Sequence, residues 1–370
     1  MSDKIYLPGL NGIRAVAALS VAFSHINNRL DYYKLPKGEL LDLANFGVTI
    51  FFTLSGFLIT YLLLKELEKT GGIDVKKFYM RRVLRIWPLY YLFLFIVICL
   101  TGFENLQWPI LFYLFIIPNF KNSFNGIIAT VVGSRNLVFM VGHYWSLGVE
   151  EQFYAFWPWI VRKSKIFYKF LIYFPLFYII LKVSLKLGHA PNGLLTFFHY
   201  TRFGCLTIGA LGAYLYYHND AKVKWIMSKW WLEVFAWIML LIVAFNKFHL
   251  ASVIDHEIIS LVTLIIIFNQ IGNPKRLISL ENKLFDYLGK ISFGLYVYNP
   301  LVIYGMSFLL NYLVIENQIL KQIVIYTTVV PAIVAVSHIS YNFYEKRFLK
   351  MKFNYTTVHS AASKSESQSE

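Results

Sequence analysis

The amino-acid sequence predicts an all-α protein in which a bundle of helices crosses a membrane several times. Of its 370 residues, 57% are hydrophobic and 15% are charged, and the mean hydropathy is +0.54. A water-soluble domain carries about 25% charged residues, whereas a polytopic membrane protein has the composition found here. The apolar residues also form runs of spanning length, separated by short basic clusters. These observations together predict a polytopic transmembrane helical bundle.

Ten apolar runs predict ten spanning helices. They cover residues 12–26, 46–64, 86–102, 144–161, 166–185, 196–217, 230–248, 258–271, 284–310 and 319–343. An eleventh run, 108–120, is shorter, and we interpret it as a re-entrant segment. If this run crossed the membrane, the basic cluster that begins at Arg162 would face outward. As a re-entrant segment it leaves all the basic clusters on one side.

The basic clusters predict how the bundle is oriented. The formal net charge is +15, and the densest basic stretch, 76–85, lies between the second and third apolar runs. Cytoplasmic loops carry an excess of Lys and Arg, so this loop is predicted to be cytoplasmic, with both chain termini on the same side. The placement of the clusters between apolar runs favours membrane topology over nucleic-acid binding, and we expect no nucleic-acid partner.

The sequence predicts one membrane domain, 1–350, and a disordered cytoplasmic tail, 351–370. The end of the chain is rich in Ser, Lys and Glu and has little to bury. The two cysteines, Cys99 and Cys205, lie inside apolar runs, where a thiol behaves as a small hydrophobic group. No disulfide framework or zinc-binding spacing is visible in the sequence, and we expect no metal.

Ionisable residues inside an apolar run point to the functional region. Arg14 and His25 both lie in the first run. Eleven positions are close to a whole number of helical turns, so the two side chains share a face and lie about 16 Å apart along the axis. A charge at bilayer depth costs about 2.5 to 3.5 kcal/mol, so such residues usually face a polar cavity. The alternative is that Arg14 snorkels to the inner interface while His25 caps the outer end.

Four helices are predicted to bring polar groups to one level in the outer half of the membrane. These groups are His25 in the first run, Glu150 and Glu151 in the fourth, Arg202 in the sixth, and Tyr296 and Asn299 in the ninth. The rise per residue puts the two acids about 10 Å below the outer surface. Adjacent carboxylates point about 100° apart, so at least one faces protein or water. The alternative is that these groups form separate hydrogen bonds between helices.

A second polar cluster is predicted at the cytoplasmic end of the third helix. Arg82 and Arg85 are three residues apart and share a face, with Arg81 close by. Guanidinium groups bind phosphates through two parallel hydrogen bonds and stay charged, so the cluster suits a polyphosphate. Taken alone, the cluster is better explained as a signal for topology and lipid anchoring.

Five segments in a fixed order carry a resemblance to a known family. They are the opening from Arg14 to His25, FFTLSGFLI at 51–59, RVLRIWP at 82–88, WSLGVEEQFY at 145–154 and ISFGLY at 291–296. Together they resemble the integral-membrane acyltransferase type 3 family, which includes bacterial O-antigen and peptidoglycan O-acetyltransferases. The resemblance extends over nearly the whole chain, from Leu10 to about Phe348. It implies an enzyme of the bacterial cytoplasmic membrane that takes an acyl group, usually acetyl, from coenzyme A inside the cell and delivers it to a carbohydrate hydroxyl outside.

The resemblance also implies roles for individual residues. By position, His25 resembles the catalytic histidine, Arg14 resembles its partner, and Glu150 or Glu151 resembles the acid of the Trp-Ser-Leu motif. Many members of the family have a histidine where this chain has Asn299, so no catalytic role is carried over to that position.

We expect acetyl-CoA to be the acyl donor and the hydroxyl of a cell-surface or lipid-linked carbohydrate to be the acceptor. Arg82 and Arg85, which resemble the paired arginines of the family, would hold the polyanionic end of coenzyme A together with Arg14. An imidazole titrates near neutral pH, so His25 would act as a general base, and one of the two acids would orient its ring. The residues expected to bind the acceptor are Trp145, Arg202, Tyr296 and Asn299.

Three alternatives stay open at this stage. An acyl-histidine intermediate would replace direct transfer. A transporter or flippase of a glycan or lipid-linked precursor would also place polar residues at mid-membrane, although no paired, Gly- or Pro-broken segments appear in two halves of the chain. The third alternative is a catalytically inactive assembly partner, because Asn299 stands where many members of the family have a histidine. Membrane lipids are expected partners, and the oligomeric state and the identity of the acceptor stay open.

Overall fold

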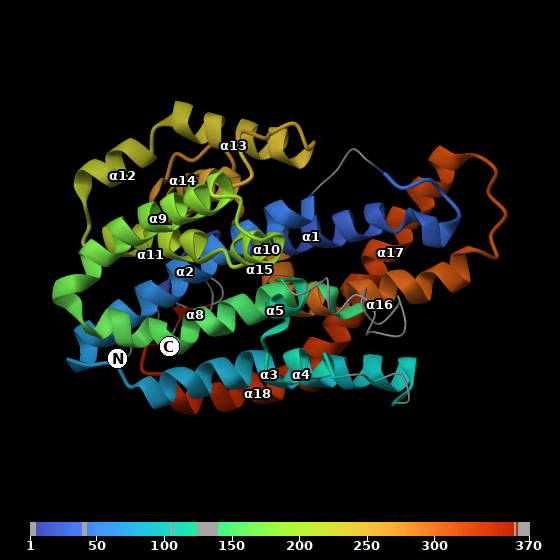
Figure 1. The fold of residues 1–370 in the computed structure, drawn as a ribbon, viewed down its shortest axis with the longest axis horizontal. Coiled ribbons are helices and arrows are strands. Elements are labelled where there is room, and N and C mark those ends of the chain that lie inside the picture. The colour runs from blue at the N-terminus through green and yellow to red at the C-terminus, as the bar shows by residue number, and fades with distance from the viewer. Residues whose placement is uncertain are drawn as a thin grey trace.

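The computed structural model is a bundle of α-helices, most of which run along its long axis (Figure 1). The structure describes residues 5–38, 43–103, 106, 108–123, 140–358 and 360–361. Each of the ten predicted apolar runs contains a helix in this part of the chain. The structure therefore confirms the prediction of an all-α, multi-pass protein.

The helices follow one another with short connections. They are α1 (Leu10–Asn28), the 3-10 turn η1 (Leu30–Tyr33), α2 (Leu43–Thr70), α3 (Val75–Thr101), α4 (Ile110–Leu114), α5 (Pro118–Ser123), α8 (Trp145–Arg162), α9 (Ser164–Leu187), α10 (Asn192–Tyr200), α11 (Phe203–Tyr217), α12 (Ala221–Met227), α13 (Trp230–Ala244), α14 (Asp255–Gly272), α15 (Lys283–Lys290), α16 (Ser292–Leu310), α17 (Gln318–Ser340), the π turn η3 (Tyr341–Glu345), α18 (Lys346–Lys352) and the 3-10 turn η4 (Phe353–Tyr355). Two short strands, β1 (Ile5–Tyr6) and β2 (Ser360–Ala361), pair in parallel.

Polar residues between the apolar runs set where several helices begin. The side chains of Asp74, Asp220, Asn282 and Asn317 each accept a hydrogen bond from the backbone N–H three residues later. Such an N-cap satisfies one of the free donors at the start of a helix. These residues therefore fix the starts of α3, α12, α15 and α17.

Helix α2 is the centre of the bundle. It packs against α1, α8, α11 and α14, and it is buried on several faces because it is apolar along most of its length. Glycines bring its backbone close to α11. A Cβ atom at Gly56 would lie 1.9 Å from the carbonyl oxygen of Leu206, and one at Gly209 would lie 2.0 Å from that of Thr53. Small residues allow such close approach of membrane helices, so α2 and α11 form a tight central pair.

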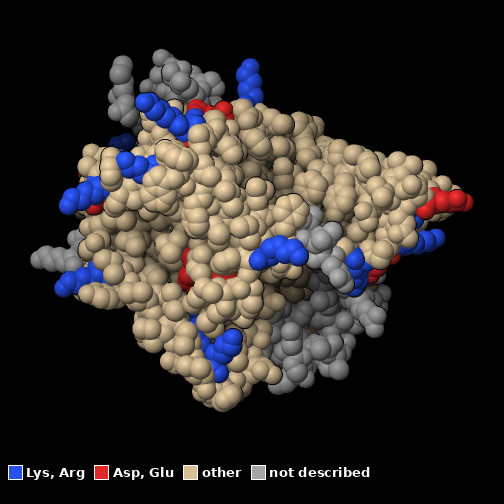
Figure 2. Space-filling view, turned by 90° about the horizontal axis from the view of Figure 1, so that it is seen from above, with Lys and Arg blue, Asp and Glu red and all other residues tan. Residues whose placement is uncertain are grey.

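Among the described residues, six helices are long and apolar enough to cross a membrane by themselves, and the bent pair of α12 and α13 makes a seventh if it counts as one span. The six are α2, α3, the part of α9 at Ile166–Leu187, α14, α16 and the stretch Gln318–Tyr355 that contains α17. Figure 2 shows a face of the molecule that is mostly uncharged, with Lys and Arg side chains mainly near its margins. Both observations fit a bundle that lies in a bilayer.

The predicted re-entrant segment, 108–120, does not form one continuous helix. It consists of α4 and the first part of α5, separated at Ile116, whose backbone has a φ of 57°. The hydroxyl groups of Tyr90 and Tyr91 on α3 donate to the carbonyl oxygens of Tyr113 and Leu114, and hold α4 against α3. A break of this kind fits the prediction that the segment does not span. Most of the predicted outer segment that follows, from 124 to 139, lies outside the described residues.

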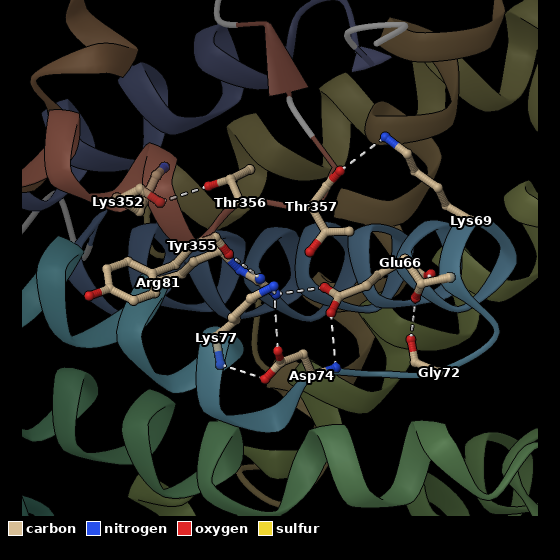
Figure 3. Close-up of polar contacts among 11 residues, drawn as sticks. Glu66, Lys69, Gly72, Asp74, Lys77, Arg81, Lys352, Tyr355, Thr356 and Thr357 are labelled. Carbon is tan, nitrogen blue, oxygen red and sulfur yellow. Dashed lines mark hydrogen bonds and ion pairs between the residues drawn. The ribbon is translucent and has the colours of Figure 1, made fainter.

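The two ends of the chain lie at the same end of the bundle (Figure 1). The predicted disordered tail begins at residue 351, but the structure places 351–355 in helix, which corrects that boundary. Helix α18 packs along α3, and Arg81 Nη1 donates a 2.8 Å hydrogen bond to the carbonyl oxygen of Tyr355, which holds this segment in place (Figure 3). Residues 359 and 362–370 of the predicted tail lie outside the described residues.

Candidate functional site

A cavity of about 90 Å³ lies between α1, α2, α3, α8 and α16. The guanidinium groups of Arg14, Arg82 and Arg85 line it, together with the carboxylate of Glu150 and the hydroxyl-bearing side chain of Tyr296. Arg14 and the arginine pair are nearly 70 residues apart in the sequence. The structure therefore brings the three predicted donor-binding residues into one cavity.

One arginine in this cavity, Arg82, carries a hydrogen-bond donor that the described residues leave without a partner. The Nε atom of Arg82 is buried and has no hydrogen-bond partner among the described residues. Its guanidinium carbon lies 5.9 Å from the ring centre of Phe78 and 5.8 Å from that of Tyr154, so aromatic faces support the charge. Within the described part of the chain, neither Arg82 nor Arg85 takes part in a salt bridge.

A fourth basic side chain comes from the end of the chain. Lys352 on α18 lies near enough to Arg14, Arg82 and Arg85 for their charges to act on its ammonium group. The sequence analysis did not find this lysine, because nothing in a basic stretch after the last apolar run shows that it folds back onto α3. Among the residues that line the cavity, Arg14, Arg82 and Arg85 outnumber the one carboxylate, Glu150. Outside the lining, Glu151 lies near Arg82 and Glu345 lies near Arg85.

Glu150 and Glu151 face different helices, as their 100° separation on α8 predicts. Ser55 Oγ donates to Glu150 Oε1 at 2.8 Å, and Tyr154 donates to Oε2 at 3.2 Å. Trp87 Nε1 donates to Glu151 Oε2 at 3.1 Å. Neither carboxylate forms a hydrogen bond or an ion pair with the predicted catalytic histidine, so the predicted pairing of an acid with that histidine is wrong. Glu150 instead lies near the charges of Arg82 and Arg85.

Glu150 does not reach His25 because the two side chains lie at different depths along their helices. The ring of His25 lies 6.1 Å from that of His143, just before α8 begins. Glu150 follows His143 by seven residues, which is about 10 Å along a helix. The carboxylate therefore lies about two turns away from His25, toward the arginines.

Asn299 takes the place next to His25 that the sequence analysis gave to an acid. Its Oδ1 lies 2.5 Å from His25 Nδ1. Its Nδ2 donates to the carbonyl oxygens of Leu295 at 3.1 Å and Tyr296 at 2.7 Å, which fixes the orientation of the amide. Because Oδ1 must then accept, His25 Nδ1 carries the hydrogen and Nε2 carries the lone pair.

Tyr296 lies on the same face of α16 as Asn299, one turn away, and connects the histidine region to the cavity. Its hydroxyl group donates to the carbonyl oxygen of His143 at 2.7 Å and lies 2.6 Å from Ser146 Oγ. Both Tyr296 and Ser146 also line the cavity. The cavity thus extends from the arginines to the residues that hold His143, close to His25.

The two other predicted acceptor residues lie behind the wall of the cavity. Arg202 is buried, and its guanidinium group donates to the backbone and side-chain oxygens of Asn45 and to Thr49 Oγ1 at 3.0 to 3.1 Å. Its guanidinium carbon lies 5.1 Å from the ring centre of Trp145. Trp145 packs against Phe52, which lines the cavity. The structure gives Arg202 the hydrogen bonds between helices that the sequence analysis had left as an alternative.

Some residues at the site were within the quoted motifs without being singled out. Ser55 belongs to the 51–59 segment, Tyr154 ends the 145–154 segment and His143 precedes it by two residues. The motif boundaries therefore contained the signal for Ser55 and Tyr154, whereas His143 lies just outside them. Among the described residues, no group of three or more His, Cys, Asp or Glu side chains is arranged to hold a metal ion.

The fold and the cavity define a multi-pass helical membrane protein with a cationic site between its helices, next to a buried histidine. The chain belongs to the family whose model is described as "Acyltransferase domain", which matches residues 7–341. The family resemblance inferred from the five motifs is thereby confirmed. No solved structure matches the chain at a significant level.

Relatives support the same family. A protein of Staphylococcus aureus (strain COL) that is named as an O-acetyltransferase is 30% identical, over 93% of this chain and 58% of its own length. The peptidoglycan O-acetyltransferase OatA of Listeria monocytogenes is 32% identical, over 42% of this chain and 24% of its own length. YrhL of Bacillus subtilis, named as a peptidoglycan O-acetyltransferase, is 33% identical over 41% of this chain and 23% of its own length. The chain thus spans little more than half the length of the relatives that it matches most fully.

Proposed function

We propose that this protein transfers an acyl group, in the first instance acetyl, from acyl-CoA to a hydroxyl group of a cell-surface or lipid-linked carbohydrate. The observation that carries the proposal is the cavity lined by Arg14, Arg82 and Arg85 and, farther along, by Tyr296. The hydroxyl group of Tyr296 holds the backbone of His143, whose ring lies 6.1 Å from that of His25. The names of the relatives, which are O-acetyltransferases and include one for peptidoglycan, support the same reaction and the same kind of acceptor.

The arginine end of the cavity suits the donor, because coenzyme A carries several phosphate charges at its nucleotide end. Phosphates need charged N–H donors, and Arg82 Nε is buried without a hydrogen-bond partner among the described residues. Arg85, Arg14 and Lys352 add positive charge around the same space. We propose that these residues bind the phosphates and that the acyl end extends along the cavity toward His25.

The histidine end supplies the proton chemistry. With Nδ1–H donated to Asn299, His25 presents Nε2 as the basic nitrogen. Nε2 would accept the proton of the acceptor hydroxyl as the oxygen attacks the acyl carbon, and would return it to the departing thiolate. Attack by Nε2 itself, which gives an acyl-histidine, is the alternative route. Glu150 balances the arginines in this scheme, and its hydrogen bonds to Ser55 and Tyr154 support that role.

We propose ten spanning helices, a re-entrant 108–120 segment, cytoplasmic termini and a location in the bacterial cytoplasmic membrane. The common position of the chain ends supports termini on one side, and the basic 76–85 stretch near them supports the cytoplasmic side. In this orientation the arginines lie near the cytoplasm, where acyl-CoA is made, and His25 lies toward the outside. Lipids and the carbohydrate would be the partners, with no nucleic acid, no metal and an open oligomeric state.

The direct test is release of free thiol from acetyl-CoA by the purified protein in lipid nanodiscs, with peptidoglycan fragments supplied as the source of acceptor hydroxyl groups. We expect thiol release by the wild type and its loss in His25→Ala. General base catalysis contributes about 10² to 10⁴-fold, so the loss should be at least that large. Membrane insertion of His25→Ala should match the wild type. A transporter, a flippase or an inactive assembly partner would release no thiol, and a well-inserted His25→Ala protein with wild-type activity would refute the assigned base.

A further inference from the structure

His143 is a buried side chain without a hydrogen-bond partner in the part of the chain that the structure describes. It lies just before α8, and 6% of its surface is exposed. Both ring nitrogens, Nδ1 and Nε2, are buried, and neither has a hydrogen-bond partner among the described residues. A buried imidazole that makes no hydrogen bond loses its contacts with water and gains nothing in return. Such a group in a native fold requires an explanation.

The position of His143 next to the cavity and to His25 offers an explanation for its ring nitrogens, which the described residues leave without a hydrogen bond. Its ring centre lies 6.1 Å from that of His25 and 5.0 Å from that of Tyr296. Its backbone carbonyl is held by the hydroxyl of Tyr296, and Ser146 Oγ lies 3.3 Å from the same oxygen. Tyr296 and Ser146 both line the cavity. The fold thus fixes the backbone of His143 directly behind Tyr296 and Ser146 in the cavity wall. Its ring nitrogens have no hydrogen bond among the described residues, although the backbone of Val297 lies close to the ring.

The imidazoles of His25 and His143 lie close together, which favours one as a proton acceptor and the other as a neutral hydrogen-bond donor. The ring centres lie 6.1 Å apart, a distance at which two positive imidazolium charges would repel each other. When His25 accepts a proton, His143 is therefore held in its neutral form. A neutral imidazole still carries one N–H donor. At the histidine end, a free N–H donor beside a general base suits an oxygen that gains negative charge during the reaction.

We propose that His143 is a second catalytic residue, whose ring N–H donates a hydrogen bond to the acyl carbonyl oxygen. This inference rests on the proposed function. The acceptor hydroxyl gives its proton to His25 Nε2 while its oxygen bonds to the acyl carbon, and the carbonyl electron pair moves onto the oxygen that His143 binds. When the carbonyl re-forms, the C–S bond breaks and His25 returns the proton to the thiolate. His143 transfers no proton and stays neutral throughout.

Three substitutions test this role by the release of free thiol from acetyl-CoA in nanodiscs, with peptidoglycan fragments supplied as the source of acceptor hydroxyl groups. His143→Phe keeps an aromatic ring among Phe93, Tyr144 and Tyr296 but removes both nitrogens. Loss of one donor to a developing oxyanion lowers kcat by about 10² to 10³-fold. We expect a loss of this size for His143→Phe, with KM for acetyl-CoA changed less than about threefold, since the donor phosphates bind at the other end of the cavity.

A matched pair covers the case in which His143→Phe does not fold. His143→Gln and His143→Met have side chains of similar length and flexibility, but only Gln carries an N–H donor. We expect His143→Gln to exceed His143→Met in kcat by about tenfold or more, with equal retention of coenzyme A binding measured by calorimetry. Equal kcat in the pair, or a folded His143→Phe protein with wild-type kcat, would overturn the inference. A wild-type protein that releases no thiol would instead overturn the proposed function, so the two failures are distinguishable.

Discussion

Asn299 holds His25 through a hydrogen bond between Oδ1 and Nδ1, and two backbone carbonyls on α16 hold Asn299. The orientation of one amide therefore decides which nitrogen of His25 is basic. In hydrolytic triads a carboxylate has this task. In this protein the neutral amide of Asn299 orients the imidazole. The carboxylates of Glu150 and Glu151 accept hydrogen bonds from Ser55 and Trp87 instead.

The first residue-scale prediction concerns this amide. Asn299→Leu removes the acceptor for Nδ1–H, so the imidazole is free to take the other tautomer, and we expect thiol release from acetyl-CoA to fall by about 10² to 10⁴-fold. Asn299→Asp keeps an acceptor oxygen and should stay within about tenfold of the wild type. Coenzyme A binding by both variants, measured by calorimetry, is the control for folding. Wild-type activity in Asn299→Leu would show that Asn299 does not set the tautomer.

The second residue-scale prediction concerns the donor phosphates. Arg85→Lys keeps the charge but loses the two-pronged guanidinium donor, and one charge-assisted hydrogen bond is worth about 1.5 to 3 kcal/mol. We expect the Kd for coenzyme A to rise about tenfold or more. Arg162→Lys, at an exposed position at the end of α8, is the matched control and should bind as the wild type does. If Arg85→Lys and Arg162→Lys bind coenzyme A with the same Kd, Arg85 does not bind the phosphates and contributes only to membrane topology.

At the scale of elements, α18 and η4 form a segment that closes against the start of α3 (Figure 3). Arg81 links three parts of this region: it forms a 2.8 Å ion pair with Glu66 on α2 and donates to the carbonyl of Tyr355. The side chain of Glu66 is 3% exposed and that of Arg81 12%, so the pair is shielded from water. At the same turn, the backbone N–H of Lys77 lowers the pKa of Asp74, which keeps this cap charged.

The prediction at this scale compares two ion pairs. Arg81→Met leaves the carboxylate of Glu66 buried without its cation, a change that costs about 3 to 5 kcal/mol in buried pairs. We expect a Tm lower by about 5 °C or more in detergent, and faster tryptic cleavage at Lys350 and Lys352. Lys77→Met breaks the exposed pair with Asp74, whose side chains are 49% and 45% exposed, and should change stability by less than about 1 kcal/mol. Equal Tm values for the two variants would refute the structural role of Arg81.

At the scale of the whole molecule, the bundle has one end that carries the chain ends, the α2–α3 turn and Lys352, and an opposite end near which α1 and its histidine finish (Figure 1). The cavity connects the arginines of the first end to the region of His25. The proposed transfer from cytoplasmic acyl-CoA to an outer hydroxyl group requires the first end to face the cytoplasm.

This orientation predicts the labelling of single cysteines by a membrane-impermeant thiol reagent on intact cells, after replacement of Cys99 and Cys205. Glu316→Cys lies in the loop between α16 and α17, and should react. Lys163→Cys and Lys222→Cys lie at the end that carries the chain ends, and should react only after the membrane is opened. Labelling of Lys163→Cys on intact cells would show that the orientation proposed here is reversed or that 108–120 crosses the membrane.

The sequence by itself determined the helical class, the positions of the apolar runs and the shared face of Arg14 and His25, because composition and helical period depend on the chain alone. The family was indicated by the resemblance of five ordered motifs. The sequence also indicated the Arg82 and Arg85 pair. Only the tertiary structure decided that Asn299 rather than Glu150 meets His25, that Arg202 lies behind the cavity wall, and that His143 and Lys352 lie at opposite ends of one site. The helical period gives the face and the height of a side chain on its own helix. The neighbour that this face meets depends on how helices distant in sequence cross and align, and that information is absent from the pattern of any single helix.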